Sequence, residues 1–183
     1  LIAAAKAKPD SINVALPSTT ARIVYELFKQ RSGAQLFGVA YKGSATAMTE
    51  VMGGQIPLTI DTITATRTLV QSGKLKALAV TTLKTSELLP GVKSVAEQGL
   101  PGFEVTAWNA LYAPKGTPKE AMDKLVAALQ AAVKDPDVNK RFADLGATAY
   151  PADKATSAAL QAHLKAEIDK WAPIIKKAGV YAD

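Results

Sequence analysis

The 183-residue sequence contains no cysteine and a single histidine, and each shortage excludes a kind of chemistry. Without cysteine there is no disulfide, no thiolate metal site and no cysteine nucleophile. His163 stands on a predicted lysine-rich helix, where we expect it on the solvent side. No Gly-x-Ser-x-Gly turn accompanies it to supply a nucleophile. We therefore predict no catalytic residue and expect that the protein is not an enzyme.

Metal sites and cofactor-binding loops are lacking as well. The carboxylates are scattered, without the spacing of zinc or calcium ligands. Neither a phosphate-binding loop nor the glycine pattern of a dinucleotide-binding turn occurs. Gly53-Gly54-Gln55 stands at the end of a predicted helix, where paired glycines are an ordinary stop signal. We predict no metal and no cofactor.

Long apolar runs are also missing. A membrane-spanning helix needs about 20 mostly apolar residues, and no run approaches that length. The 48% hydrophobic and 21% charged residues are typical of a soluble globular protein. Leu1–Lys8 reads as the last turns of a helix that Pro9 stops, without an initiator Met or a signal peptide. We therefore expect a fragment, whose signal peptide belongs to a part that precedes it.

Aromatic residues make up only 6% of a chain whose formal net charge is +6. The positive charge favours an anionic partner: a small acid, a lipid surface or a nucleic acid. Single-stranded nucleic acid requires aromatic platforms inside a basic groove, but here the lysines and arginines are spread along helix surfaces. We predict no nucleic-acid partner and keep a basic nucleic-acid-binding module as a minor alternative.

What is present in the first half is an alternation of apolar runs and amphipathic stretches, which indicates an α/β fold with a parallel sheet. The predicted strands are Ile12–Leu16, Leu36–Ala40, Ile56–Ile60 and Leu75–Val80. The predicted helices are Arg22–Ser32, with Gly33 as its stop, a segment from Ser44 to Gly53-Gly54 that Ser44 caps, and a Thr-rich helix from Ile63 to Ser72. Turns follow between Thr82 and Gly102, with a single helical turn at Val95–Gln98, and then an extended segment, Phe103–Tyr112.

From Thr117 onward the pattern is mostly helical. The predicted features are a capping box at Thr117-Pro118-Lys119-Glu120, a stop and new cap at Asp135-Pro136, an end at Gly146, a short strand at Ala147–Tyr150, and a long helix that Asp153 opens and that Pro173 either kinks or deprives of its regular hydrogen bonding. These helices carry one apolar face each and need a partner surface. We infer that they pack on a second lobe, most of which precedes this chain.

The candidate site follows from the geometry of parallel sheets, which bind ligands where strands end and helices begin. Three such junctions occur: Leu16-Pro17-Ser18-Thr19-Thr20, Tyr41-Lys42-Gly43-Ser44 and Asp61-Thr62-Ile63-Thr64. Unpaired amides and the helix dipole favour an anion at such turns. Each hydroxyl has N-capping as its competing role. Asp61, unsuited to an anion, either caps the following helix or accepts from a ligand hydroxyl, an amine or water.

Short motifs follow one another in a fixed order along essentially the whole chain. They are Glu26-Leu27-Phe28-Lys29, Ala40-Tyr41-Lys42-Gly43, Gly53-Gly54-Gln55, Gly73-Lys74-Leu75-Lys76-Ala77-Leu78-Ala79-Val80-Thr81, Ala96-Glu97-Gln98-Gly99-Leu100-Pro101-Gly102-Phe103-Glu104, Trp108, Ala113-Pro114-Lys115-Gly116-Thr117-Pro118, Ala166-Glu167 and Lys170-Trp171. The series resembles the Bug-type extracytoplasmic solute receptors of tripartite tricarboxylate transporters. An ordered series is far more specific than any one of its members.

The resemblance implies a periplasmic-binding-protein-like fold, the type II Venus flytrap, with the ligand between two lobes. Residues 1–107 would form lobe two, with the parallel sheet and the ligand-facing turns. Residues 108–183 would form the crossover and the helical C-terminal part of lobe one, whose remainder is missing. The receptor would be monomeric and periplasmic, and would deliver a small carboxylate unchanged to the permease subunits of the transporter. An enzyme acting on a small organic acid is the second alternative.

By the same resemblance, the lobe-two contacts fall on the three turns reached above from sheet geometry. The expected ligand-binding residues are Ser18, Thr19, Thr20, Tyr41, Lys42, Gly43, Asp61 and Thr62. The first turn departs from the Gly/Ser-rich turn usual in the family, because Pro17 removes an amide donor and Leu16 adds bulk. This turn either binds through its hydroxyls or selects a more apolar acid.

Overall fold

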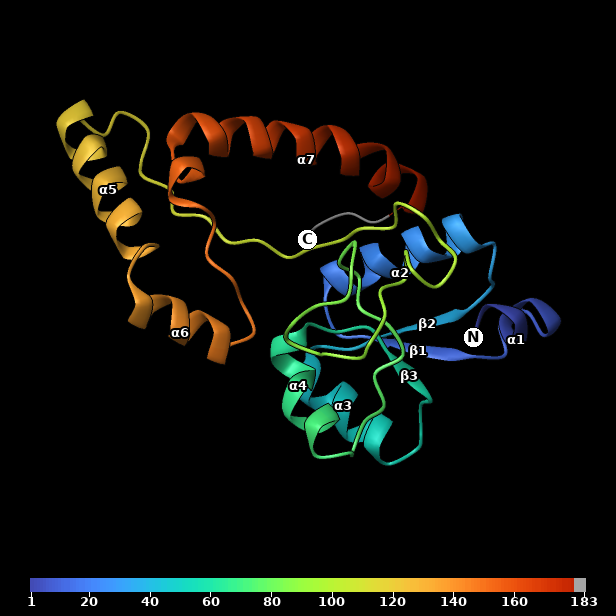
Figure 1. Cartoon of the computed structure of the whole chain (residues 1–183). Helices are drawn as coiled ribbons and strands as arrows, with labels where there is room; N and C mark the ends of the chain where they lie inside the picture. Colours follow the sequence, from blue (N-terminus) through green and yellow to red (C-terminus); the bar gives the residue numbers. More distant parts are fainter. Residues whose placement is uncertain (180–183) are drawn as a thin grey trace. The chain divides into compact units, whose positions relative to one another are not determined.

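A computed structural model describes residues 1–179, so the last four residues of the predicted second domain lie outside the described part (Figure 1). The chain forms two compact units. One is Leu1–Ala107 together with the chain from Ile174 onward, and the other is Trp108–Pro173. The first unit holds the sheet, and the second is helical.

Three parallel strands form the sheet of the first unit. They are β1 (Asn13–Leu16), β2 (Phe37–Ala40) and β3 (Leu58–Thr59), in the order β2-β1-β3. In β1, Val14 pairs with Gly38 of β2 and with Leu58 of β3. The central strand is the most buried, with Val14, Ala15 and Leu16 all inside. The first three predicted strands are thus confirmed.

A helix follows each strand, as the alternating pattern predicted. These helices are α2 (Thr19–Ser32), α3 (Ser44–Met52) and α4 (Ile63–Gln71), and a short helix, α1 (Ile2–Ala7), precedes the sheet. The end of α2 is set by Gly33, whose left-handed backbone (φ 67°) donates its N–H to the carbonyl of Lys29. A residue with a Cβ adopts that conformation only with strain, which confirms Gly33 as the stop.

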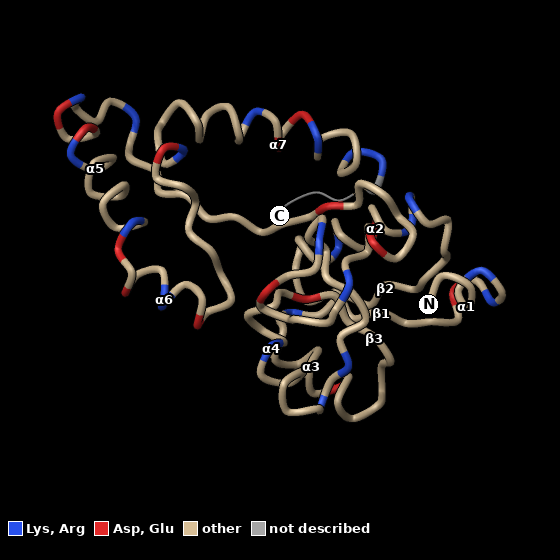
Figure 2. Tube along the Cα trace, viewed as in Figure 1, with Lys and Arg blue, Asp and Glu red and all other residues tan. Residues whose placement is uncertain are grey.

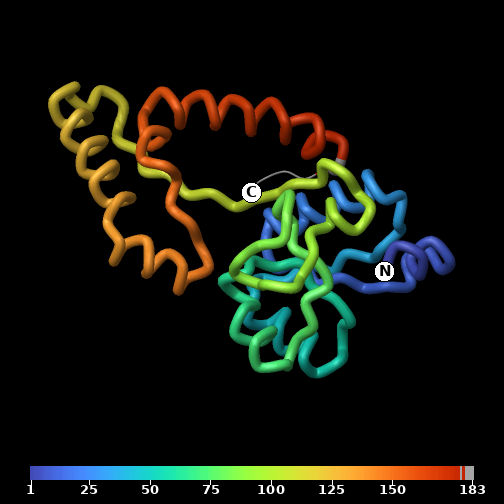
Figure 3. The backbone as a smooth tube through the Cα atoms, in the orientation of Figure 1, coloured from blue at the N-terminus to red at the C-terminus, as the bar shows by residue number. Residues whose placement is uncertain are grey.

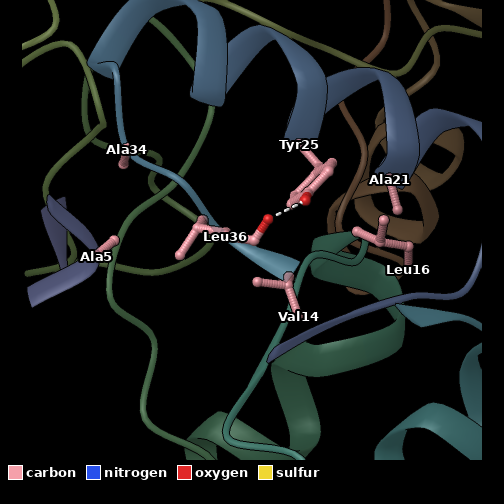
Figure 4. Packing of buried hydrophobic residues seen from close by; sticks show 7 residues of the cluster. All are labelled: Ala5, Val14, Leu16, Ala21, Tyr25, Ala34 and Leu36. Carbon is pink, nitrogen blue, oxygen red and sulfur yellow. Dashed lines mark hydrogen bonds between the residues drawn. The ribbon is translucent and has the colours of Figure 1, made fainter. Parts of the chain in front are cut away.

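The two faces of the sheet bury different side chains, because neighbouring residues of a strand point to opposite sides. On one face, Val14 and Leu16 pack against Ala21 and Tyr25 of α2 (Figure 4). The hydroxyl of Tyr25 donates to the carbonyl of Leu36 at the start of the β2 segment, as the dashed line in Figure 4 shows.

Helix α3 covers the opposite face of the sheet. There Ala15 of β1 packs against Ala47 of α3 and against Ile56, and partly buried side chains, among them Tyr41, pack against this cluster. A sheet with helices on both faces is the doubly wound α/β arrangement.

The predicted fourth strand, Leu75–Val80, is wrong. Only Val80 takes part in an isolated parallel bridge, to Ser94, and the rest of the segment forms no ladder among the described residues. The backbone here has other partners: the carbonyl of Leu78 accepts from the side-chain amide of Gln98. Of the segment's apolar side chains only Val80 is buried, and Leu78 is 48% exposed.

The loops that follow are held by side chains rather than by regular structure. Phe103 packs edge-on against Phe28 of α2, with ring centroids 6.3 Å apart. The predicted single helical turn at Val95–Gln98 forms, since the Gln98 amide donates to the Ser94 carbonyl at 3.1 Å. The Ser94 amide donates to the Glu97 carboxylate (2.7 Å), and the Glu97 amide donates to Oγ of Ser94 (3.1 Å), which is the reciprocal pair of a capping box.

The second unit contains α5 (Lys119–Ala132), α6 (Pro136–Asp144), a 3₁₀ turn (Ala152–Lys154) and most of α7 (Ser157–Ala178); Figure 3 traces the backbone through them. The predicted cap at Asp135 is confirmed, since its carboxylate accepts from the amides of Asp137 and Val138. The capping box at Thr117 is wrong: the Thr117 hydroxyl donates to the Pro114 carbonyl instead, and α5 begins without a side-chain cap.

Two further predictions for this unit are corrected. Residues 147–150 form no strand, because no partner strand lies among the described residues of the unit. Asp153 lies in the 3₁₀ turn, and α7 starts later, where the Thr156 hydroxyl accepts from the Ala159 amide. The long helix runs on through Pro173.

No side chain of residues 108–173 is fully buried, although the unit is rich in apolar residues. Leu111 is 75% exposed, and Leu125 and Leu145 are also exposed. The charges alternate in sign along α5, α6 and α7 (Figure 2), and lysines pair with carboxylates one turn away, as Lys165 does with Asp169 at 2.6 Å. These solvated pairs neutralise several lysines of this unit.

Within residues 1–179, no helix combines the length and the apolar character needed to cross a membrane.

Candidate ligand-binding site

Three turns meet at one edge of the sheet. Because β2, β1 and β3 are neighbours and parallel, their carboxyl ends all lie at that edge. The turns are 17–20 after β1, 41–44 after β2 and 61–64 after β3, and each leads directly into a helix. The structure therefore brings the three predicted junctions to one side of the sheet in the first unit.

The turn after β1 places three hydroxyls at the start of α2. Ser18, Thr19 and Thr20 are all exposed. Oγ of Ser18 accepts from the Ala21 amide at 3.1 Å and so caps the helix. A hydroxyl that accepts in this way keeps its own proton for a second partner. The prediction that Leu16 adds bulk to the turn is wrong, because its side chain is buried in the core.

The turn after β3 contains Asp61 and Thr62. The cap of α4 is Thr62, whose Oγ1 accepts from the Ala65 amide at 3.3 Å, and not Asp61. One carboxylate oxygen of Asp61 accepts from the Thr62 amide at 2.8 Å. The other is buried and has no hydrogen-bond partner within the described residues.

The turn after β2 is the one that no side chain caps. Gly43 occupies the N-cap position of α3 with extended backbone, and α3 has no side-chain cap. Ser44 is the first residue of the helix, so its predicted capping role is wrong. The first amides of a helix lack intrahelical acceptors, so those of α3 point out of the turn without a side-chain partner in the described structure.

Lys42 supplies the positive charge of this turn. Its side chain is exposed and makes no ion pair within residues 1–179. An ammonium group beside the uncapped amides of α3 creates a region of positive potential.

Tyr41 is held in place at two points. Its amide donates to the Leu16 carbonyl at 3.1 Å, which ties this turn to the end of β1. Its hydroxyl donates to the carboxylate of Glu50 on α3. The hydrogen bond to Glu50 raises the pKa of Tyr41, with burial and the negative charge of Glu50 adding to the effect. Tyr41 therefore stays protonated at neutral pH.

Glu50 is a residue of this turn's hydrogen bonding that the sequence did not indicate. It stands nine residues after Tyr41 on an amphipathic helix, where a glutamate ordinarily faces solvent. Only the folded turn shows that the phenol reaches it.

The histidine lies elsewhere and is not on the solvent side, contrary to the prediction. His163 belongs to the second unit, where it is half-buried and packs edge-on against Trp108, with ring centroids 4.8 Å apart. Tyr150 lies on another side at 6.0 Å. Among the described residues, no group of histidine, aspartate or glutamate side chains could hold a metal ion.

Comparisons with known proteins are consistent with these features. A sequence model described as "Tripartite tricarboxylate transporter family receptor" matches residues 1–180. A curated Agrobacterium vitis protein, the UPF0065 protein in the TAR-I ttuE-ttuC' intergenic region, is 44% identical over 153 residues, which is 84% of this chain and 44% of that protein. The chain thus spans less than half of this relative.

Two solved structures are similar to the chain over most of its length. The periplasmic binding protein BugD is 35% identical with a TM-score of 0.77, and the match covers 100% of this chain and 61% of BugD. R. palustris Rpa4515, solved with adipate, is 30% identical with a TM-score of 0.81, and the match covers 97% of this chain and 59% of Rpa4515. The predicted α/β binding-protein fold is confirmed by these likenesses.

Proposed function

The chain belongs to the tripartite tricarboxylate transporter receptor family, and we propose from this premise that it forms much of a receptor for a small carboxylate. The ligand is bound and released without covalent change. The observation that carries the proposal is the meeting of three helix starts at one sheet edge, of which α3 is uncapped and lies beside Lys42.

The chemistry of this edge fits a carboxylate. The amides at the start of α3 and the ammonium of Lys42 are donors, and the exposed hydroxyls of Ser18, Thr19 and Thr20 can donate as well. Each helix start contributes about 0.3–1 kcal/mol toward a nearby negative charge, so convergence of several is needed to hold a small acid. Rpa4515, solved with adipate, supports a carboxylate as the class of ligand.

We assign roles to seven of the eight predicted residues, all except Tyr41, by their surroundings. Lys42 and Gly43 lie at the uncapped helix start and are the principal contacts. Ser18 and Thr62 cap their helices and can contact the acid only through their remaining hydroxyl proton. Thr19 and Thr20 contribute exposed hydroxyls. Asp61, with one buried oxygen lacking a partner, accepts from a donor group of the ligand or from water.

The two units correspond, in this proposal, to parts of two lobes, except that the chain from Ile174 onward belongs to the first unit but is assigned to lobe one. Residues 1–107 form lobe two, and residues 108–183 form the crossover and the C-terminal part of lobe one. The absence of any buried side chain over residues 108–173, together with the exposed Leu111, supports a further segment of lobe one that covers this unit. That the match covers only 61% of BugD agrees with such a segment.

The receptor acts in the periplasm as a monomer and delivers its ligand to permease subunits of a tripartite tricarboxylate-type transporter. The periplasmic location is supported by BugD, which is a periplasmic binding protein, and the transporter by the family match.

A thermal-shift screen tests the proposal. The purified protein is heated with adipate, succinate, citrate, benzoate, nicotinate and aspartate, with an oligonucleotide as control. A ligand that binds only the native state stabilises it by about 2.7 kcal/mol at a hundredfold excess over its Kd. We expect one class of acids to raise the melting midpoint and the oligonucleotide to leave it unchanged. A shift with the oligonucleotide alone would refute the proposal.

A further inference from the structure

The turn after β2 has little to hold it in place apart from Tyr41. A Cβ at Gly43 would meet no atom within 4 Å, and the Lys42 side chain is exposed. Within residues 1–179, the bond from Tyr41 to Glu50 is the only side-chain hydrogen bond that residues 41–44 make. The Tyr41 ring meanwhile packs into the cluster of Ala15, Ala47 and Ile56.

Glu50 is itself fixed, so it can serve as an anchor. It lies within α3, and its carbonyl accepts from the Gln55 amide at 3.0 Å, which ties it to the chain that leads into β3. Tyr41 thus connects the end of β1, through its amide, to the body of α3, through its hydroxyl.

The direction of the bond limits what Tyr41 can do for an anionic ligand. A phenol has one proton, and Tyr41 donates it to Glu50. The oxygen then has only acceptor capacity left, whereas a carboxylate ligand needs donors.

We propose that Tyr41 and Glu50 are a positioning pair: together they hold Lys42 and the first amides of α3 in the orientation that binds the carboxylate, and the Tyr41 hydroxyl does not itself contact the ligand. This inference rests on the proposed carboxylate-binding function. It changes the role of Tyr41 from ligand contact to support, and it adds Glu50, which acts through the turn.

The test is a double-mutant cycle in calorimetric titration, with the acid that gives the largest shift in the screen above. The variants are Tyr41→Phe, Glu50→Ala and the double variant, with Glu50→Gln as the conservative replacement. We expect each single variant to weaken binding about tenfold, and the double variant to be no weaker than either, because both remove the same bond. Glu50→Gln keeps an acceptor oxygen and should retain most of the affinity. Thr49→Ala, an exposed neighbour on α3, is the matched control and should bind as the wild type does.

A direct contact between Tyr41 and the ligand gives a different pattern. Tyr41→Phe would then weaken binding while Glu50→Ala left it unchanged or strengthened it, and this result would overturn the proposal. Equal affinity of all variants would also overturn it.

Hydrogen exchange of the Tyr41 and Ala47 amides, which donate to the carbonyls of Leu16 and Gly43, is measured without ligand and separates this inference from the function on which it rests. We expect faster exchange in Tyr41→Phe and Glu50→Ala than in Thr49→Ala. If the wild type binds no acid, the proposed function fails, and with it the role in binding, while the exchange rates still show whether the pair holds the turn. Unchanged exchange in both variants would show that it does not.

Discussion

At the residue scale, the side chains where the strands end divide into those that cap a helix and those that leave its amides open. Ser18 and Thr62 accept from amides of their own helices, as N-cap residues ordinarily do. Gly43 has no side chain that could accept. The first amides of α3 are therefore left open to a ligand, whereas α2 and α4 each have one amide bonded to a cap. The sequence predicts all three turns at one edge, but it could not tell caps from open amides, because this depends on which residue takes the N-cap position: in α3 it is Gly43 and not the predicted Ser44.

A serine at position 43 should make stability and binding change in opposite directions. The backbone of Gly43 (φ 169°, ψ 167°) is extended, as is that of the capping residue Ser18 (φ −154°, ψ 163°), so Gly43→Ser can cap α3. We expect the free energy of unfolding to rise by about a few tenths of a kcal/mol, while the acid binds more weakly because the hydroxyl competes for the same amides.

Urea melts and calorimetric titration of the same Gly43→Ser preparation measure both effects. Gly43→Ala is the control, since it adds a methyl group without an acceptor. Stronger acid binding by the serine variant would contradict the account.

Reversing the charge of Lys42 should affect binding alone. Lys42→Glu places a carboxylate beside the bound acid, and we expect at least a tenfold loss of affinity, about 1.4 kcal/mol. The exposed side chain makes no ion pair among the described residues, so the free energy of unfolding should change by less than about 0.5 kcal/mol. Lys76→Glu, an exposed lysine outside the three turns, is the matched control. A comparable loss of stability in Lys42→Glu would show a structural role instead.

Glu97 should make part of the stability sensitive to acid. Its pKa is lowered, first by the Ser94 amide and then by the hydroxyls of Ser94 and Thr85. A carboxyl whose folded pKa lies below its unfolded value, about 4.3, stabilises the fold above that pH and loses this contribution as pH falls through the folded pKa. Urea melts from pH 7 to pH 3 should therefore fall more steeply for the wild type than for Glu97→Gln. Parallel curves would contradict the assignment.

At the scale of elements, the sequence predicts a strand well where the chain is buried on both faces and a helix follows. Only β1 satisfies both conditions, since β2 and β3 are partly exposed, but a helix follows each of the three and the predicted ends lie within two residues of the observed ones. Leu75–Val80 looks equally apolar, but it forms no ladder, and apolar content alone cannot show whether a neighbouring strand is available. Thr117 is not a cap because Pro118 occupies the N-cap position of α5, and the Thr117 hydroxyl donates to the Pro114 carbonyl.

A substitution at Gly38 of β2 tests how closely the side chains between α2 and the sheet are packed. A Cβ at this position would lie 2.7 Å from Cδ1 of Leu16 and 3.1 Å from the Tyr25 ring, so the contact permits no larger residue without movement. We expect Gly38→Ala to lower the free energy of unfolding by about 1–3 kcal/mol, as overpacking ordinarily does. Denaturant melts measure the loss, and Gly43→Ala, whose added methyl meets nothing within 4 Å, is the comparison. Equal stability of the two variants would contradict the crowding at α2.

At the scale of the whole molecule, the two units differ in how far they bury their side chains. The first has a core on both faces of its sheet. Residues 108–173 bury no side chain fully, and the aromatic contact of His163 with Trp108 is among their few tight contacts. Amphipathic patterning predicts helices that need a partner surface, and it cannot identify that surface, because the spacing within a helix does not show what packs against it.

A polar residue at Leu111 should therefore leave this chain as stable as before. Leu111 is 75% exposed, so Leu111→Gln removes almost no packing, and we expect a change in unfolding free energy within about 0.5 kcal/mol. In a longer receptor that includes the covering segment, the same change should lower the melting midpoint. Leu16→Gln, in the core, is the positive control and should destabilise both proteins. Loss of stability on Leu111→Gln in the 183-residue chain alone would contradict the assignment.

The central claim is that a small carboxylate binds where β1, β2 and β3 end, and amide chemical shifts of the ¹⁵N-labelled protein during titration with the best acid of the screen test it most directly. The account predicts saturable shifts that are largest for residues 18–20, 42–46 and 61–63, with the amides at the start of α3 foremost. Shifts confined to residues outside these turns, or none in the presence of any acid of the screen, would contradict it.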